Sequence, residues 1–526
     1  MLFACAPSVL AHIAHAASNT DPFAYDPQFN DGVIVEDRFA STTSSTTMLG
    51  ERVFVSPHYN GDPNGDVVAS GLVAVAYQGS PANNFGSVRY DYLGQRIGWG
   101  DPMSAFTYYD NHYLDWPNLT TANVSRVDDV KTFQGYVITL LDLGSAVSGG
   151  TYLRTYIDGG PNTNGGQPIY GHTVNSGLIS AGAALVPYTF PTFDGGGNPI
   201  TAYRLIVVET STSSSGQRII TMKRYILDIA TGNLTVDTSF GTSGSGAVDE
   251  VAPNSLCNAG TSCSWDVAAA TALRTNTDNP TLYLGGTAYS RTSELRDDGV
   301  IVSVNGYDGS LNSSFGGLLS PGYYVNHLAN PSEVVALAAT TSGAAASDVV
   351  FVTSSETYTY GACPAYPAAV TKLLAQTPTG IHGFPATAAD GSFADNGTLR
   401  FGGELADCVY STFPADMLVD DNRLVIVGAE ELVPALISAS PPEVPLFAIV
   451  RTSDGALTDY QRGVLSPLHA NGTPWGGGTF NSVALRSPGH YAVTGAIIDA
   501  SANSASLFGT AVIASDRIFG DDFESP

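Results

Sequence analysis

The sequence predicts an all-β protein, a seven-bladed β-propeller that closes by pairing its N-terminal and C-terminal strands. Three observations point to this fold: a composition that favours strands and turns, a short apolar segment that recurs seven times, and chain ends that both fall in mid-repeat. Seven similar units suit a ring of blades. The alternative is two β-sandwich domains divided near residue 250 by the Ser/Gly stretch 241–247, but the repeat spacing continues evenly across that point.

The composition narrows the class of protein. Of 526 residues only 13% are charged, whereas 57 are Gly and 30 are Pro. Gly and Pro are the residues that turns require, and 43% hydrophobic residues are enough to build a large core. The net charge of -27 argues against nucleic acid as a partner, because phosphate backbones require a basic surface. Beyond excluding such partners, the net negative charge is a statement about the solubility of the protein.

The repeat unit is a pair of apolar segments that reads as a β-hairpin. The first segments end at positions spaced by 64, 69, 76, 68, 75 and 67 residues, a mean of about 70. They are residues 72–76, 136–140, 205–209, 281–285, 349–353, 424–428 and 491–495. The second segments are residues 87–91, 151–156, 219–225, 300–304, 369–373, 447–451 and 509–513. Several lead into Asp-Gly or Leu-Gly turns, at Asp158, Asp308, Asp454 and Leu93, which favour tight connections.

A third element follows some of these hairpins, with the pattern Asp-x-Ser-Phe-Gly, a few residues, Gly, then a strand. It is clearest at 237–241, with 312–316 matching its core, 390–393 close to it, and a similar form at 26–35. We expect each Phe (Phe29, Phe240, Phe315 and Phe393) to anchor a blade corner. Basic residues also recur near the ends of the second segments, at Arg89, Arg154, Lys223 or Arg224, Lys372 and Arg451. Salt bridges to the turn Asp residues are their expected role, and a ring that binds an anion is the alternative.

These residues resemble the delta-60 repeat of bacterial extracellular proteins, most clearly over 219–320, 369–456 and 25–37. The resemblance implies a β-propeller-like array. The copies at 87–100 and 137–160 lack the Ser-Phe-Gly core. The C-terminal residues 516–526 resemble a short terminal motif of secreted proteins from xanthomonad-type bacteria, except that Asp521-Asp522 stands where the usual form has Asp-Gly. That resemblance implies export.

The positions of both chain ends within the repeat indicate a closed ring. The chain starts at the Phe29 corner and a strand at 33–35, and it ends after the hairpin around 505–513. We therefore predict that residues 33–37 pair in the same sheet as residues 507–514, which would remove two open sheet edges. The predicted boundaries are a signal peptide at 1–16, a single propeller at 25–516 and a tail at 517–526.

The N-terminal segment and the cysteines suggest an exported protein. Residues 2–17 are small or apolar and end in an Ala-His-Ala cleavage pattern, although no basic residue precedes them. We expect a secreted, periplasmic or cell-surface location and no transmembrane segment. Removal of the signal peptide would leave four cysteines, Cys257, Cys263, Cys363 and Cys408. An even number of cysteines in an exported protein suggests disulfides, and we favour the pairings 257–263 and 363–408 over the other two possible arrangements.

One segment carries a candidate ligand site. Residues 106–117 combine aromatic rings with carboxylates and amides, the groups that bind sugars by stacking and hydrogen bonding. The candidate residues are Tyr108, Tyr109, Asp110, His112, Tyr113, Asp115 and Trp116. The alternative is that these aromatics cover a blade edge. Asp110 and Asp115 could also form an acid/base pair.

Other chemistry has weak support in the sequence. It contains no nucleophile elbow, zinc helix or phosphate-binding loop. No metal or cofactor is predicted, with calcium at the Asp-rich stretches 60–66 and 516–522 as an alternative. We expect an exported, non-enzymatic propeller that binds a ligand, or a protein or glycan partner, at its loop face. The alternatives are a polysaccharide-active lyase or hydrolase and a structural or adhesive surface module.

Overall fold

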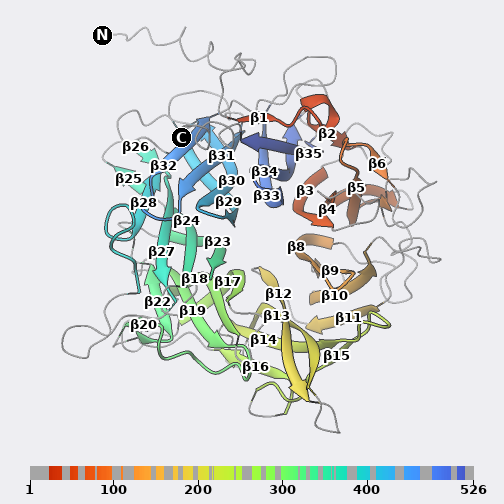
Figure 1. Ribbon diagram of the computed structural model, residues 1–526, viewed down its shortest axis with the longest axis vertical. Coiled ribbons are helices and arrows are strands. Elements are labelled where there is room, and N and C mark those ends of the chain that lie inside the picture. Colours follow the sequence, from red (N-terminus) through yellow and green to blue (C-terminus); the bar gives the residue numbers. More distant parts are fainter. Residues whose placement is uncertain are drawn as a thin grey trace, which may run out of the picture.

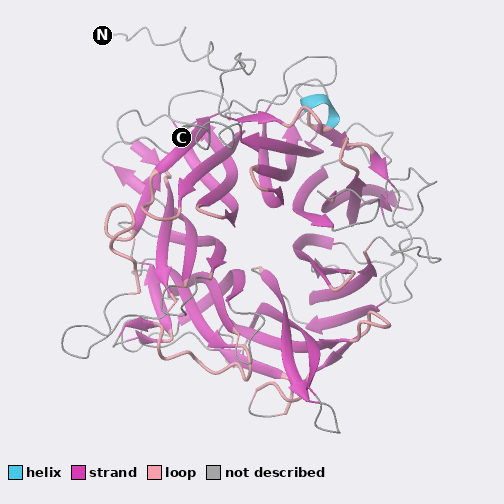
Figure 2. Ribbon diagram, in the orientation of Figure 1, coloured by secondary structure: helices cyan, strands magenta, loops and turns pink. Residues whose placement is uncertain are grey.

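In the computed structural model of the protein, the regular secondary structure is almost entirely β-strand (Figure 2). One short 3-10 helix, η1 (Asn30–Gly32), lies near the N-terminus. The structure describes residues 23–37, 48–56, 65–77, 80–97, 108–109, 124–143, 150–158, 170–175, 182–193, 199–212, 216, 218–241, 244–250, 263–273, 280–290, 298–317, 320–326, 328, 332–341, 348–356, 358–360, 363–375, 388–402, 410–432, 443–462, 477–498 and 506–515.

Seven antiparallel sheets form the blades, and each contributes one inner strand that faces the axis. The inner strands are β3 (Met48–Ser56), β8 (Val124–Phe133), β12 (Ala183–Phe193), β17 (Cys263–Leu273), β23 (Ser332–Thr340), β29 (Tyr410–Asp420) and β33 (Gly477–Ser487). The second strands are β4 (Asp66–Tyr77), β9 (Tyr136–Leu143), β13 (Pro199–Thr212), β18 (Thr281–Ser290), β24 (Val349–Glu356), β30 (Arg423–Leu432) and β34 (His490–Ile498). The third strands are β5 (Ser80–Tyr90), β10 (Gly150–Ile157), β14 (Arg218–Leu227), β19 (Asp298–Asn305), β27 (Ala368–Leu374), β31 (Glu443–Arg451) and β35 (Ser506–Ser515).

Shorter strands complete the blades at the outer rim. They are β6 (Arg96–Ile97), β11 (Tyr170–Asn175), β15 (Leu234–Val236), β22 (Tyr323–Asn326), β28 (Thr398–Phe401) and β32 (Leu457–Arg462). Two more strands, β7 (Tyr108–Tyr109) and β16 (Ala247–Glu250), pair with the third strands of their blades. Two small hairpins stand apart from the blades: β20 (Gly316–Gly317) with β21 (Ser320–Pro321), and β25 (Tyr358–Tyr360) with β26 (Cys363–Ala365).

The ring closes through the last blade, as predicted. The N-terminal strands β1 (Phe23–Tyr25) and β2 (Val35–Asp37) both pair with the C-terminal strand β35, with Val35 opposite Thr510. Figure 1 shows the two ends of the described chain side by side and the inner strands arranged around the centre. The two-sandwich alternative is therefore wrong, because the blades on either side of residue 250 belong to one ring.

All seven predicted hairpins are present, as the second and third strands of the blades. These strands are the most apolar because both of their faces are covered by neighbouring blades. Residues 424–427 of β30, for example, are fully buried, as is Val207 in β13. Burial of this kind contributes roughly 25 cal/mol per Å2 of apolar surface.

The Asp-x-Ser-Phe corners are buried anchors, as predicted. Phe29, Phe240, Phe315 and Phe393 are each exposed by 1% or less. In the copy at Asp237, the carboxylate Oδ1 accepts the Ser239 N–H at 3.1 Å and the Ser239 hydroxyl at 2.6 Å. The Phe240 N–H then bonds the Asp237 carbonyl at 3.0 Å, so the turn places the ring in the core. The copies at 312–315 and 390–393 repeat these bonds.

Several of the basic residues that recur near the ends of the second segments pair with carboxylates in turns. Arg224 Nε lies 2.9 Å from Asp237 Oδ2, and its guanidinium stacks 4.8 Å from the Phe240 ring centre. Lys372 lies 3.0 Å from Asp390. Arg451 pairs in the same way with Asp454, whereas Arg89 pairs with Asp66, at the start of β4, and with the turn residue Asp158 of the next blade. Burial raises the pKa of Asp237, but the Ser239 hydroxyl and the charges of Arg224 and Arg204 outweigh it, so the pKa is lowered.

The two faces of the ring differ in their connections. At one face, here called the turn face, inner strands pass to second strands through tight turns such as Gln134–Gly135, Asp421–Asn422 and Pro488–Gly489. At the other, the loop face, the second strands end. Their last residues are Tyr77, Leu143, Thr212, Ser290, Glu356, Leu432 and Ile498. Because strands alternate in direction, connections between blades return to this loop face.

Candidate functional site

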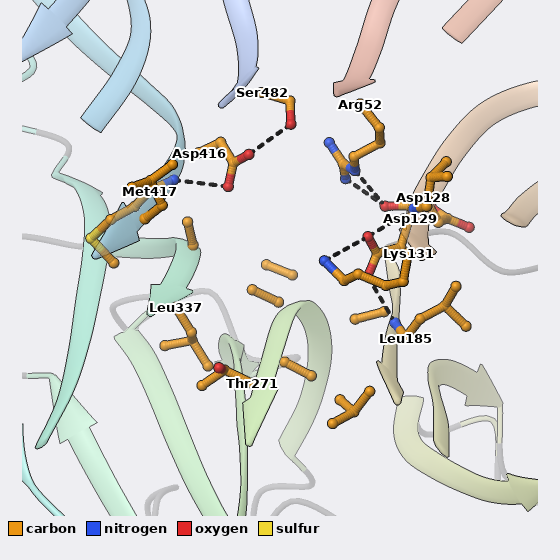
Figure 3. Close-up of a pocket in the computed structure, with 18 of the residues that line it drawn as sticks. Arg52, Asp128, Asp129, Lys131, Leu185, Thr271, Leu337, Asp416, Met417 and Ser482 are labelled. Atoms are coloured by element: carbon orange, nitrogen blue, oxygen red, sulfur yellow. Dashed lines mark hydrogen bonds and ion pairs between the residues drawn. The ribbon is translucent and has the colours of Figure 1, made fainter. Parts of the chain in front are cut away.

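An axial cavity of about 380 Å3 lies between the inner strands of all seven blades (Figure 3). Each inner strand is an edge strand on its axial side, so its backbone N–H and C=O groups there lack a strand partner. The cavity is thus built from strand edges and from the side chains that satisfy them. The inner strands were not identified in the sequence, so this site was missed.

β-bulges shape the cavity wall. Six of the seven inner strands shift register against their second strand near mid-length, and only β12 runs without a bulge. The residues placed at these bulges are Glu51, Asp128, Ala268, Val335, Ala415 and Asn481. A bulge bends its strand and redirects side chains, so a mixed set of polar and small residues reaches the axial side.

Side chains connect neighbouring blades around the cavity. At five of the seven junctions, an oxygen from one blade accepts an inner-strand N–H of the next. The bonds are Ser482 to Val53 (3.2 Å), Glu51 to Val127 (2.6 Å), Asp129 to Leu185 (2.9 Å), Thr210 to Val267 (2.9 Å) and Asp416 to Val483 (3.0 Å). Each bond satisfies a buried edge N–H that would otherwise cost about 1–3 kcal/mol. Asp129 and Asp416 therefore hold the ring together.

The charged part of the wall comes from blades one, two and six. Arg52 Nε and Nη2 donate to the Asp128 carbonyl, at 2.9 and 2.5 Å, and Nη1 donates to the Glu51 carbonyl at 2.9 Å. Lys131 Nζ lies 3.0 Å from Asp129 Oδ1, and 43% of the Lys131 side chain is exposed. On the other side of Ser482 from Arg52 in Figure 3, Asp416 accepts the Met417 N–H at 2.8 Å and the Ser482 hydroxyl at 2.8 Å.

The remaining wall is made of small side chains. Blades three to five contribute mainly alanine, and Figure 3 labels three of their other side chains, Leu185, Thr271 and Leu337. The alanines that these three blades contribute are Ala183, Ala184, Ala268, Ala269, Ala270, Ala272 and Ala336. Short side chains leave space at the axis, so the cavity has one charged wall and one apolar wall.

A buried carboxyl cluster lies behind the charged wall. Asp128 Oδ1 is 2.5 Å from Arg126 Nε, while Asp128 Oδ2 is buried without a hydrogen-bond partner. Burial raises the pKa of Asp128 to about 7, against the opposing effect of Arg126 and with a further contribution from the Asp142 carboxylate. Burial also raises the pKa of Glu51. The Asp128 side chain is only 1% exposed, so its carboxyl group does not reach a ligand in the cavity.

The predicted aromatic site is placed only in part. The backbone of Tyr108 and Tyr109 forms β7, which pairs with the third strand of the first blade, opposite Ser87 and Gly86. This position is at the outer rim of the blade and not on the inner strand. The next described residue is Val124, at the start of β8. Asp110, His112, Tyr113, Asp115 and Trp116 lie outside the described residues, so the ligand site there stays a prediction.

Other sequence candidates gain little from the structure. Asp66, from the first calcium candidate, is bonded to Arg89 at 2.8 Å, and the described residues hold no cluster suited to a metal ion. Residues 516–522 lie outside the described chain, as do residues 1–22. The described part contains no disulfide, and Cys257 and Cys408 fall outside it, so both pairings stay predictions. No described helix is long and apolar enough to cross a membrane.

Comparisons with known proteins give only distant similarities to solved structures. No family model matches the chain, and no curated protein sequence does. Among solved structures, it is similar to a protein of unknown function from Dyadobacter fermentans (10% identity, TM-score 0.34, covering 92% of this chain and 98% of that one). It is also similar to the α-L-arabinanase of Cellvibrio cellulosa (11% identity, TM-score 0.29, covering 65% and 96%). A putative glycoside hydrolase from Bacteroides ovatus matches at 7% identity and TM-score 0.25, covering 63% and 86%. At these values nothing about activity follows, and the delta-60 resemblance stays a prediction.

Proposed function

We propose that this protein is an exported, non-catalytic β-propeller that binds a ligand, or a protein or glycan partner, at its loop face, with the axial cavity as part of the binding surface. The observation that carries the proposal is that the carboxylates lining the axial cavity are occupied by structural hydrogen bonds. Asp129 and Asp416 each accept two backbone N–H groups, so they stabilise the ring. The cavity beside them stays open.

A polysaccharide-active lyase or hydrolase is the second candidate. One observation favours it: the pKa of Asp128 is raised to about 7, close to the value at which a general acid or base works best at neutral pH. The burial of the Asp128 side chain weighs against that role, because a catalytic carboxyl group must contact its substrate. The third candidate, an adhesive surface module, needs no cavity.

A glycan array with the full chain tests the proposal. We expect binding that Trp116→Ala abolishes, because residues 106–117 hold the predicted aromatic platform. Tyr307→Ala is the matched control, since Tyr307 is a 54% exposed aromatic on a turn between strands β19 and β22. Equal loss in both variants would contradict a specific site. Turnover of an acidic polysaccharide that Asp110→Asn abolishes would favour the enzyme instead. Absence of binding together with self-association would favour the adhesive module.

A further inference from the structure

The axial cavity carries two opposite charges, Arg52 and Asp416, that form no salt bridge with the described residues. The three described bonds of the Arg52 guanidinium all go to neutral carbonyl oxygens, and they use three of its five N–H donors. The described bonds of the Asp416 carboxylate all come from neutral donors: the N–H groups of Met417 and Val483 and the Ser482 hydroxyl. Each group is held in position by hydrogen bonds, and neither forms a salt bridge with a described residue. The Arg52 charge does act on the nearby carboxyl groups of Glu51 and Asp128, where it opposes the rise in their pKa values.

These two charges lie on adjoining parts of the same wall. Ser482 connects them, since its oxygen donates to Asp416 and accepts the N–H of Val53, the residue after Arg52. Figure 3 shows Arg52 and Asp416 on either side of Ser482, with the cavity between them and the alanine wall. Lys131 adds a second cation on the Arg52 side of the cavity. Among the described residues, its ammonium group forms an ion pair with Asp129. Arg52 and Lys131 therefore place two cations on blades one and two, beside the carboxyl groups of Asp128 and Asp129, and Asp416 places an anion on blade six.

We propose that the axial cavity binds a small zwitterion, an α-amino acid with an apolar side chain, whose carboxylate lies at Arg52 and Lys131 and whose ammonium group lies at Asp416. The apolar side chain then packs on the small residues of blades three to five, such as Ala268. A cavity of about 380 Å3 accommodates a molecule of this size. A zwitterion also carries no net charge to be repelled by the overall charge of -27. The inference rests on the proposed function, because it names a ligand class for the same cavity.

Calorimetric titration of the full chain with L-leucine tests this inference. Two analogues each lack one charge: 4-methylpentanoate has no ammonium group, and 3-methylbutylamine has no carboxylate. L-leucine is expected to bind at least about tenfold more tightly than either analogue, because only L-leucine satisfies both charges. Equal affinities for the three compounds would overturn the proposal, as would the absence of binding at about 10 mM L-leucine.

Two variants assign the charges. Arg52→Gln should weaken L-leucine binding by about tenfold and leave 3-methylbutylamine binding unchanged, because that amine has no carboxylate. Asp416→Asn should likewise weaken L-leucine binding by about tenfold, but it should leave the binding of 4-methylpentanoate, which has no ammonium group, unchanged. Arg451→Gln and Asp454→Asn are matched controls, since this pair lies on an outer turn with side chains 47% and 50% exposed. Should Asp416→Asn fail to fold, Lys131→Gln provides the test, because the Lys131 side chain is 43% exposed and, among the described residues, its ammonium group forms an ion pair with Asp129 alone. Wild-type affinity in Arg52→Gln and in the second variant used would overturn the assignment. Glycan binding without L-leucine binding would leave the proposed function standing and refute this inference alone.

Discussion

Replacing Asp128 by Asn should make the protein more stable at pH 8 and leave its stability nearly unchanged at pH 4. In the folded protein, burial raises the pKa of Asp128 from 3.8 to about 7. The native state therefore binds one more proton than the unfolded state between these two values. Stability contributed by this group is present below about pH 4 and declines as the pH rises toward 7, because the unfolded state is stabilised by releasing a proton that the buried group in the native state retains.

The size of the effect follows from the pKa difference. A difference of about three units, at roughly 1.4 kcal/mol each, amounts to about 4 kcal/mol. Asparagine has nearly the same shape and no charge to desolvate, so the variant escapes this penalty at high pH. The difference in unfolding free energy between variant and wild type should therefore grow by about 4 kcal/mol from pH 4 to pH 8.

Urea unfolding at several pH values measures this difference, with two spectroscopic probes to check that the transition is cooperative. Asp142→Asn is the coupled variant: removal of the Asp142 charge lowers the pKa of Asp128 and should reduce the pH dependence in part. A difference between Asp128→Asn and wild type that stays constant from pH 4 to pH 8 would refute the reasoning.

Three further predictions concern the stability of the ring and use thermal or urea unfolding. Phe240→Ala should cost about 3–5 kcal/mol because it empties a buried corner, whereas Ile229→Ala, at a 48% exposed position, should change stability by about 0.5 kcal/mol or less; equal effects would contradict the anchoring role. Arg89→Ala should cost about 3–5 kcal/mol by removing the cation that the buried carboxylates of Asp66 and Asp158 share, and the exposed counterpart Arg451→Ala about 0–1 kcal/mol. Asp129→Ala should cost about 1–3 kcal/mol for each N–H left without an acceptor, and unchanged stability would show that water replaces the carboxylate.

The strands that could be predicted are those with covered faces. Second and third strands lie between neighbouring blades, so they read as short apolar runs such as residues 424–427. The corners could also be predicted, because the turn at Asp237 and the burial of Phe240 both require particular residue types. Ring closure followed from the hairpin at the C-terminal end and the strand at 33–35.

The inner strands, and with them the cavity, could not be predicted. Their axial edges face the cavity and their bulges break the two-residue alternation, so β8 mixes Asp129 and Lys131 with valines and β17 contains a run of alanines. One signal was available: each blade needs a strand before its hairpin, and an acidic residue there can satisfy the edge of the next blade. Asp129 and Asp416 both occupy such positions.

The most direct test of the closed ring is hydrogen exchange at the strand where the chain ends meet. The amides of β35 (Ser506–Ser515) should be strongly protected in the full chain, because β1 and β2 cover its outer edge. In a chain that begins at residue 38, these amides should exchange much faster, whereas β13 (Pro199–Thr212), in a distant blade, should keep its protection. Unchanged protection of β35 after the truncation would contradict a ring closed by the N-terminal strands.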